Sequence, residues 1–348
     1  MKQRAQMNHD YRIGFACKIV ADVSDKKQKQ VLESQFNTKS TTVAALHKLN
    51  KTQKVEKLYG IVSQNAEILA RQMRLVGSWP KTMRMMRISS DIWPCFTHEE
   101  VNPIYQEPLL QQAMSLLNHA GELAKSHDIR LSMHPGQFTM LVSHKTSTVD
   151  RAIEDLEYHA EIFRRMGISH TDQRTEINIH GGARVPNFHE QFIANWRRLS
   201  HDAQQWISVE NDEYSYGIDD LLPLSKYVKI CIDVHHHWIR EEQYLSPQYP
   251  MINIIVESWR GARPEMHVST SHESADGDGI TMPQFSTHRV KKALWRKHSD
   301  FCYNTQLNQY FLEFLSQFDI MVEAKMKNLA AKQLLEQYQN RIIDAPVS

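Results

Sequence analysis

The sequence has few cysteines and no long apolar run. Its four cysteines, Cys17, Cys95, Cys231 and Cys302, lie far apart in 348 residues and form no CxxC pair. This spacing argues against a disulfide framework and against a cysteine zinc site. No segment approaches 18 uninterrupted apolar residues, and the N-terminal MKQRAQMNHDYR has no apolar signal core. We therefore expect a cytoplasmic protein that does not enter a membrane.

The chain also lacks a charge excess. Its 41 basic and 40 acidic residues give a formal charge of +1, so no global basic field indicates a nucleic-acid partner. Basic side chains are concentrated only locally, in residues 71–87 and 288–298, where they are candidates for phosphate contacts. Low-complexity linkers and internal repeats are missing too. The sequence therefore predicts one domain over residues 1–348, with flexible tails at about 1–10 and 340–348.

Short β-type runs alternate with longer segments whose apolar residues recur every three or four positions. Such alternation indicates parallel strands joined by helices, and eight units favour a closed (β/α)₈ TIM barrel. Segments 18–50 and 269–297 are too long for ordinary connections, and we expect elaborated loops there. The eight strand candidates are 11–17, 84–90, 129–134, 176–180, 206–210, 227–233, 264–268 and 318–323.

Histidine is abundant, with 19 copies, and many metal-binding side chains follow the predicted strands. The stretch CIDVHHHWIR places His236 three residues after Asp233. In a TIM barrel, the C-terminal ends of all strands meet at one mouth. Acids and histidines gathered there would repel one another or stay unpaired without a cation. The strand-end residues are His134, His180, Glu210, Asp233, His267 and Glu323.

The mixture of side chains indicates the kind of metal site. Histidine and carboxylate without thiolate suit Mn²⁺, Zn²⁺ or Fe²⁺. There are too many ligands for one tetrahedral ion, so a carboxylate that bridges two ions is the economical arrangement, as in two-metal phosphoester hydrolases. The residues alone therefore predict a multinuclear metal hydrolase or isomerase on a barrel.

At these same positions the chain resembles the UV-damage endonuclease family, which is related to endonuclease IV-type barrels. Each matching motif is short, but nine occur in the family's order and each falls where a strand ends. The motifs are RIGFAC (12–17), RISSDIWP (87–94), MHPGQF (133–138), NIHGG (178–182), VEND (209–212), IDVHHH (232–237), MHVS (266–269), HSDF (298–301) and VEAKMK (322–327).

The resemblance implies roles for individual residues. His134, His180 and Glu210 would bind one ion, and Glu210 would bridge to a second ion held by Asp233, His267 and Glu323. A third ion would be held by His236 and His298, with Asp300 as a further candidate. His98 would serve as an auxiliary ligand or phosphate contact, and Lys325 would neutralise carboxylate or phosphate charge. Two or three ions per chain are expected, with Mn²⁺ favoured and Zn²⁺ as an alternative.

The resemblance also implies hydrolysis of damaged double-stranded DNA directly 5′ to UV photoproducts and other lesions, which leaves a 3′-hydroxyl. Gln137 and Phe138 would form the wedge beside the lesion. Phe15 and Ile19 stand where relatives usually carry polar Tyr and Asn probes, and Glu265 stands where they usually carry lysine. These departures put the lesion preference in doubt. We expect a monomer that acts on the nucleoid.

Two rival functions remain open on the sequence. Metal-dependent sugar isomerases use similar ligands on the same barrel, but the pair His236 and His298 and the basic segment 288–298 argue against one. A lesion-binding protein with reduced cleavage is suggested by Phe15, Ile19 and Glu265. The complete set of metal-binding side chains argues against that alternative.

Overall fold

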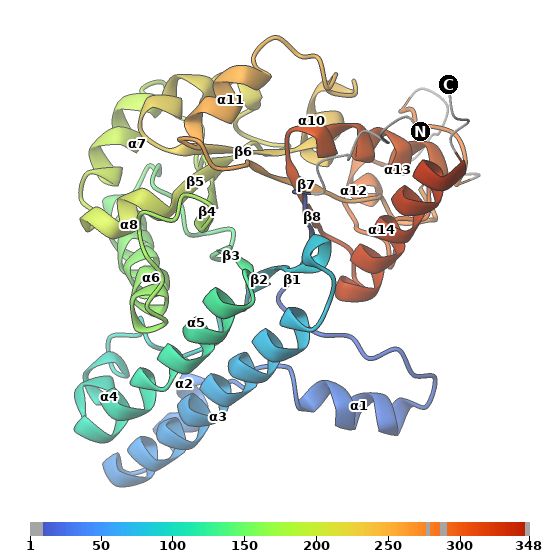
Figure 1. Ribbon diagram of the computed structural model, residues 1–348. Helices are drawn as coiled ribbons and strands as arrows, with labels where there is room; N and C mark the ends of the chain where they lie inside the picture. The colour runs from blue at the N-terminus through green and yellow to red at the C-terminus, as the bar shows by residue number, and fades with distance from the viewer. Residues whose placement is uncertain (1–9, 276–278, 286–290, 345–348) are drawn as a thin grey trace.

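The structure is a computed structural model that describes residues 10–275, 279–285 and 291–344. Eight parallel strands form a closed barrel in the order of the sequence, and helices surround it (Figure 1). The predicted fold class is therefore confirmed. The strands are β1 (Ile13–Ala16), β2 (Met85–Ile88), β3 (Arg130–Met133), β4 (Glu176–His180), β5 (Ile207–Glu210), β6 (Lys229–Asp233), β7 (Glu265–Val268) and β8 (Asp319–Val322).

Helical segments connect successive strands. The α-helices are α1 (Lys26–Ser34), α2 (Val43–His47), α3 (Lys51–Gly77), α4 (Pro108–Ser115), α5 (Leu117–Ser126), α6 (Thr146–Arg165), α7 (Phe188–Trp196), α8 (His201–Trp206), α9 (Ile218–Leu221), α10 (Val234–Glu241), α11 (Ile252–Ser258), α12 (Lys292–Trp295), α13 (Thr305–Glu313) and α14 (Lys327–Asp344). The 3₁₀ turns are η1 (Lys81–Met83), η2 (Asn102–Gln106), η3 (Leu222–Lys226) and η4 (Phe314–Ser316).

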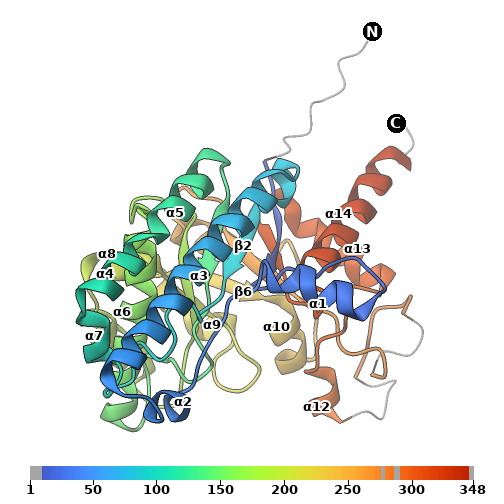
Figure 2. The same cartoon turned by 90° about the horizontal axis from the view of Figure 1, so that it is seen from below.

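Burial explains why these segments adopt their structures. Strand residues are buried on both faces, as expected for a parallel sheet covered by helices. Helix α6 buries Val149, Leu156 and Phe163 along one face, which is the spacing of an amphipathic helix. Helices α3 and α5 lie side by side in both views (Figures 1 and 2). At the start of α5's second turn Gly121 is required, because a Cβ there would lie 1.7 Å from the carbonyl oxygen of Met166.

The long connections are built as predicted from loops with short helices. Segment 18–50 contains α1 and α2, and segment 269–297 contains α12. A small apolar cluster that includes Trp238, Ala275 and Trp295 holds the second segment against α10. Helix α14 extends to Asp344, into the predicted C-terminal tail, whereas residues 1–9 and 345–348 lie outside the described residues. Among the described helices, we find none with the length and apolar character needed to cross a membrane.

Charged side chains fill the N-terminal end of the barrel interior. Arg130, at the start of β3, lies 2.8 Å from Oδ2 of Asp319 and 3.5 Å from Oε2 of Glu265. Ser132 donates a hydrogen bond to Oε1 of Glu265 at 3.2 Å. Glu265 is therefore paired with Arg130 inside the barrel, and its Oε1 also lies 3.6 Å from Nε2 of His267. We call Arg130, Glu176, Lys229, Glu265 and Asp319 the N-terminal charge layer.

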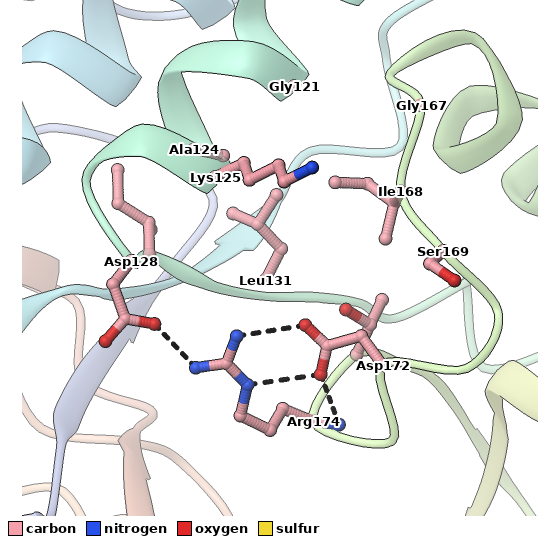
Figure 3. A pocket seen from close by; sticks show the side chains of 12 residues that line it. Gly121, Ala124, Lys125, Asp128, Leu131, Gly167, Ile168, Ser169, Asp172 and Arg174 are labelled. Atoms are coloured by element: carbon pink, nitrogen blue, oxygen red, sulfur yellow. Dashed lines mark hydrogen bonds and ion pairs between the residues drawn. The ribbon is translucent and has the colours of Figure 1, made fainter.

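A cavity of about 230 Å³ opens beside this end of the barrel, between α5 and the segment that leads into β4. Figure 3 shows its polar lining, in which Arg174 lies between two carboxylates. Its guanidinium is 2.6 Å from Asp128 and 3.0 Å from Asp172. The acidic groups in this cavity are thus paired by the chain itself, in contrast to those at the other end of the barrel.

Candidate metal centre

The strand-end residues meet at the C-terminal mouth of the barrel. Strand register brings them level, because His180 pairs with Glu210 across β4 and β5, and Asp233 pairs with His267 across β6 and β7. Glu323 follows directly after β8. The convergence that the sequence predicted is therefore present in the fold.

One group that can hold a cation consists of His134, His180 and Glu210, whose ligand atoms all lie within 4.8 Å of one another. Nδ1 of His134 lies 2.9 Å from the carbonyl oxygen of Pro135. This contact directs Nε2 toward Oε2 of Glu210, 3.3 Å away. Nδ1 of His180 is buried and has no hydrogen-bond partner among the described residues. Gly182, two residues after His180, must be glycine because its φ is +106° and a Cβ there would lie 2.5 Å from the carbonyl oxygen of Val142.

A second group shares Glu210 and adds Asp233 and His236, again with ligand atoms within 4.8 Å. Oδ1 of Asp233 accepts hydrogen bonds from the amides of His235 and His236 at 2.7 and 2.8 Å, which caps α10. Its Oδ2 is buried and accepts no hydrogen bond among the described residues. Oε1 of Glu210 lies 3.5 Å from Nδ1 of His236 and 2.9 Å from Nδ1 of His267, whereas Oε2 faces His134. Glu210 therefore stands between the two groups.

The electrostatics of the mouth reflect this crowding of acids and histidines. Burial raises the pKa of Asp233 to about 6. Burial opposes protonation of His236, but Asp233 and Glu210 outweigh it and raise the pKa of His236 to about 9. Burial also opposes ionisation of Glu210, yet His267 and His134 hold its pKa well below its usual range.

These features fit divalent cations. Two groups share one carboxylate, and buried ligand atoms on His180 and Asp233 lack partners. Imidazole and carboxylate donors without thiolate suit Mn²⁺ or Zn²⁺. The donor set at the mouth is therefore compatible with a multinuclear metal site.

Beside this site lies a cavity of about 590 Å³ that the loops after β3, β4 and β5 enclose. His180 and His236 line its inner side, and Gln137 and Phe138 line its outer side. The Phe138 side chain is 75% exposed. An exposed aromatic ring next to the metal-binding side chains is suited to contact a large planar substrate group.

The same arrangement of motifs occurs in known proteins. Residues 11–347 match the family described as UV-endonuclease UvdE. The chain belongs to this family. A relative from Bacillus mycoides (strain KBAB4), named UV DNA damage endonuclease, is 28% identical over 308 residues, which cover 85% of this chain and 88% of the relative. The Schizosaccharomyces pombe UV-damage endonuclease is 33% identical over 269 residues, or 74% of this chain and 41% of that protein.

A solved UvdE structure, SacUVDE, shares the fold. It superposes with a TM-score of 0.72 at 21% identity and covers 95% of this chain and 98% of that one. The family resemblance inferred from the sequence motifs is therefore confirmed, and so is the TIM-barrel architecture. The individual ligand assignments stay predictions.

Two residues expected to touch DNA in this UvdE member are instead core residues. Phe15 is 0% exposed and Ile19 is 5% exposed. The Phe15 ring packs 5.7 Å from that of Trp79, and the Ile19 amide donates to Asn37 at 2.9 Å. We correct the prediction accordingly, because neither side chain presents a surface to a duplex.

Several other predicted residues lie apart from the two groups. Nδ1 of His98 accepts from the Glu100 amide at 3.3 Å, and His98 joins neither group. Lys325 is 54% exposed and pairs at 3.6 Å with Asp300, which is 60% exposed and is in neither group. The His298 ring lies 5.9 Å from that of His235 and is not in either group. Of the HHH triplet, only His236 joins a group.

Two of the basic residues before β2, which the sequence suggested as phosphate contacts, instead contact groups of the protein itself. Lys81 pairs with Asp10 and Asp128, and Arg84 donates to the His127 carbonyl, at the N-terminal end of the barrel. This end is opposite the candidate metal centre. In segment 288–298, residues 288–290 lie outside the described residues, and Arg296 lies at the mouth beside Glu213.

Three polar residues that support the site were not identified from the sequence. Arg87 lies 2.6 Å from Oε1 of Glu323 and donates to Nε2 of His267 at 3.0 Å. Asn178 donates a hydrogen bond to Oε2 of Glu210. Asn211 exchanges hydrogen bonds of 2.9 Å with the backbone of Asp233. Their place in the motifs RISS, NIH and VEND was the available signal, because each lies within three residues of a predicted strand end.

Proposed function

We propose that this protein is a metal-dependent DNA repair endonuclease that hydrolyses the phosphodiester 5′ to UV photoproducts and other lesions and leaves a 3′-hydroxyl. Family membership supports an endonuclease acting on damaged DNA, as the names of its relatives indicate. The observation that carries the metal-dependent part is Glu210, which lies between two groups of metal-binding side chains at the barrel mouth. Membership of this family argues against the sugar isomerase alternative.

The proposed ligands of the first ion are the first group, and those of the other ions follow the family resemblance. His134, His180 and Glu210 would hold one ion, and Asp233, His267 and Glu323 would hold a second ion bridged by Glu210. His236 would hold a third. Divalent ions in such a site would stabilise negative charge on the phosphate and the leaving oxygen and would make water acidic enough to act as the nucleophile.

The chain's own residues keep these donors in place. Arg87 contacts both Glu323 and His267, so it fixes two ligands and limits the repulsion between Glu323 and Glu210. The amides of His235 and His236 fix Asp233 through Oδ1 and leave Oδ2 directed to the site. Backbone carbonyls hold His134 and His236 through Nδ1. Such outer contacts orient metal ligands and raise their basicity.

Substrate contact is assigned to the rim of the mouth. Phe138 and Gln137 lie beside the cavity that His180 and His236 line. An exposed aromatic ring can stack on a base or enter a distorted step. Because unstacking costs less where the duplex is already damaged, this contact favours lesions that deform DNA, such as photoproducts and abasic sites.

The test is incubation of UV-irradiated supercoiled plasmid with the metal-stripped protein, with and without added Mn²⁺. We expect nicked circles only with Mn²⁺ and irradiation, and ends that a DNA polymerase extends, since the 3′-hydroxyl is free. His119→Ala, which removes an exposed histidine on α5, is the matched control and should nick at the wild-type rate. Equal nicking in the presence of excess chelator would contradict the metal-dependent mechanism.

A further inference from the structure

A carboxylate outside the sequence-predicted set lies against the metal centre. Glu213, in the loop after β5, places Oε2 3.6 Å from Nε2 of His236. Both side chains are mostly buried, at 13% and 15% exposure. Glu213 also lines the 590 Å³ cavity with His236. The contact therefore lies between the candidate metal centre and the substrate side of the mouth.

The orientation of His236 leaves Nε2 available to a ligand. Its Nδ1 lies 3.0 Å from the carbonyl oxygen of Asn211, and a carbonyl only accepts, so Nδ1 carries the hydrogen. His134 shows the same arrangement, with Nδ1 2.9 Å from the Pro135 carbonyl and Nε2 3.3 Å from Glu210. Histidine ligands of metal ions commonly donate their second ring N–H to such a carbonyl. The His236–Glu213 pair thus repeats the geometry of the His134–Glu210 pair.

The other oxygen of Glu213 faces a different partner. Oε1 lies 3.6 Å from Nε of Arg296, and the Arg296 guanidinium lies 4.2 Å from the ring centroid of Tyr214. A guanidinium held over an aromatic face has a restricted orientation. Arg296 therefore fixes the direction of the carboxylate, with one oxygen toward itself and one toward His236.

We propose that Glu213 is a ligand of a divalent ion that it shares with Nε2 of His236, and that Arg296 is the positioning residue for this carboxylate. The inference rests on the proposed metal-dependent function. It gives Glu213 the role that the sequence suggested for Asp300, whose carboxylate is 60% exposed and pairs with Lys325. Tyr214, which follows Glu213 directly, is 63% exposed and lines the same cavity. An ion bound to Glu213 would therefore also restrict the position of Tyr214 in the cavity wall.

The test compares Mn²⁺ binding to metal-free wild type and Glu213→Gln by isothermal titration calorimetry, with elemental analysis after dialysis. Glutamine keeps the size of the side chain and removes its charge. We expect Glu213→Gln to lose one ion per chain, or to bind it at least about 10-fold more weakly, and to keep the ions of the Glu210 groups. Glu257→Gln removes an exposed carboxylate on α11 and should titrate like wild type.

Two further variants keep the test independent of folding. Glu213→Asp retains the charge and should bind the ion more tightly than Glu213→Gln. Arg296→Gln should keep the stoichiometry and weaken this one ion about 10-fold, the usual scale for losing a residue that orients a ligand. A wild-type isotherm for Glu213→Gln, with circular dichroism unchanged, would overturn the inference and leave the proposed function intact. Absence of Mn²⁺ binding by wild type would overturn both.

Discussion

The two ends of the barrel interior hold buried charge in different ways. At the N-terminal end, Arg130 lies between Asp319 and Glu265, and all three side chains are at most 1% exposed. At the C-terminal mouth, the carboxylates of Glu210 and Asp233 face histidines, and Glu323 lies between Arg87 and His267. A guanidinium keeps its charge at every relevant pH, whereas an imidazole gains or loses a proton near neutrality.

This difference separates charge that supports the fold from charge that is available for binding. In the N-terminal charge layer, Arg130 pairs with Asp319 and Glu265, so these two carboxylates are neutralised by the chain itself. At the mouth, protonated histidines substitute for cations, and metal ions can replace those protons. The comparison explains why buried acids at both ends lead to a proposed active site at only one of them.

The largest expected effect comes from removing ligands at the mouth. His134→Ala, Asp233→Ala and Glu323→Ala should each reduce nicking of UV-irradiated plasmid by at least about 10⁴-fold, because ligands that act on one reaction behave as a unit. Glu210→Ala should in addition lose more than one ion per chain. Near-wild-type nicking by two of these variants, with intact circular dichroism, would place the site elsewhere.

Breaking the N-terminal layer should affect stability instead of metal binding. Arg130→Met leaves Glu265 without its buried guanidinium and should lower the free energy of unfolding by about 3–5 kcal/mol. Urea denaturation measures this loss. Arg198→Met breaks the exposed pair with Asp150, whose side chains are 44% and 46% exposed, and should cost at most about 1 kcal/mol. An equal effect of the two variants would remove the distinction between the layer and a surface pair.

The layer should also leave a signature in the pH dependence of stability. Burial lowers the pKa of Lys229 from 10.5 to about 7, so above pH 7 the unfolded chain binds a proton that the folded chain does not. Lys229 alone should therefore contribute a rise in stability between about pH 7.5 and 9.5, of up to about 3 kcal/mol. The raised pKa of His236 acts in the opposite direction, so the contribution of Lys229 is measured as the difference between the wild type and Lys229→Met at each pH. Lys332→Met, at an exposed site on α14, should follow the wild-type profile, and equal profiles for the wild type and Lys229→Met would contradict the assignment.

The smallest effect is expected at the rim, which belongs to neither set of buried charges. Phe138→Ala should weaken binding of damaged duplex by about 1–3 kcal/mol, the scale of a lost stacking contact, and leave metal content unchanged. Fluorescence anisotropy with a labelled duplex that carries one photoproduct measures the affinity. Leu109→Ala, on α4 and 39% exposed, is the control. Unaltered affinity in Phe138→Ala would exclude the ring from substrate contact.

The sequence alone predicted the eight strands and the convergence of the candidate metal ligands that follow them. Apolar runs bounded by polar residues specify strands, and parallel strands in a barrel must end at one mouth. The sequence therefore predicted that one set of side chains would lie close together at this mouth, namely His134, His180, Glu210, Asp233 and His236. The sequence did not show which residues pair with buried charges. Arg87, the partner of Glu323, is only one of several basic residues in segment 71–87.

Only the tertiary structure decided which of the motif residues face the mouth. Phe15 lies in a family motif but is fully buried and packs against Trp79. Asp300 follows a predicted ligand in sequence, yet Lys325 holds it at the surface, and Glu213 takes its place beside His236. The order of strands is encoded locally, in apolar periodicity and turns. The direction of a loop side chain depends on partners tens of residues away in sequence, which the chain meets only after the barrel has closed.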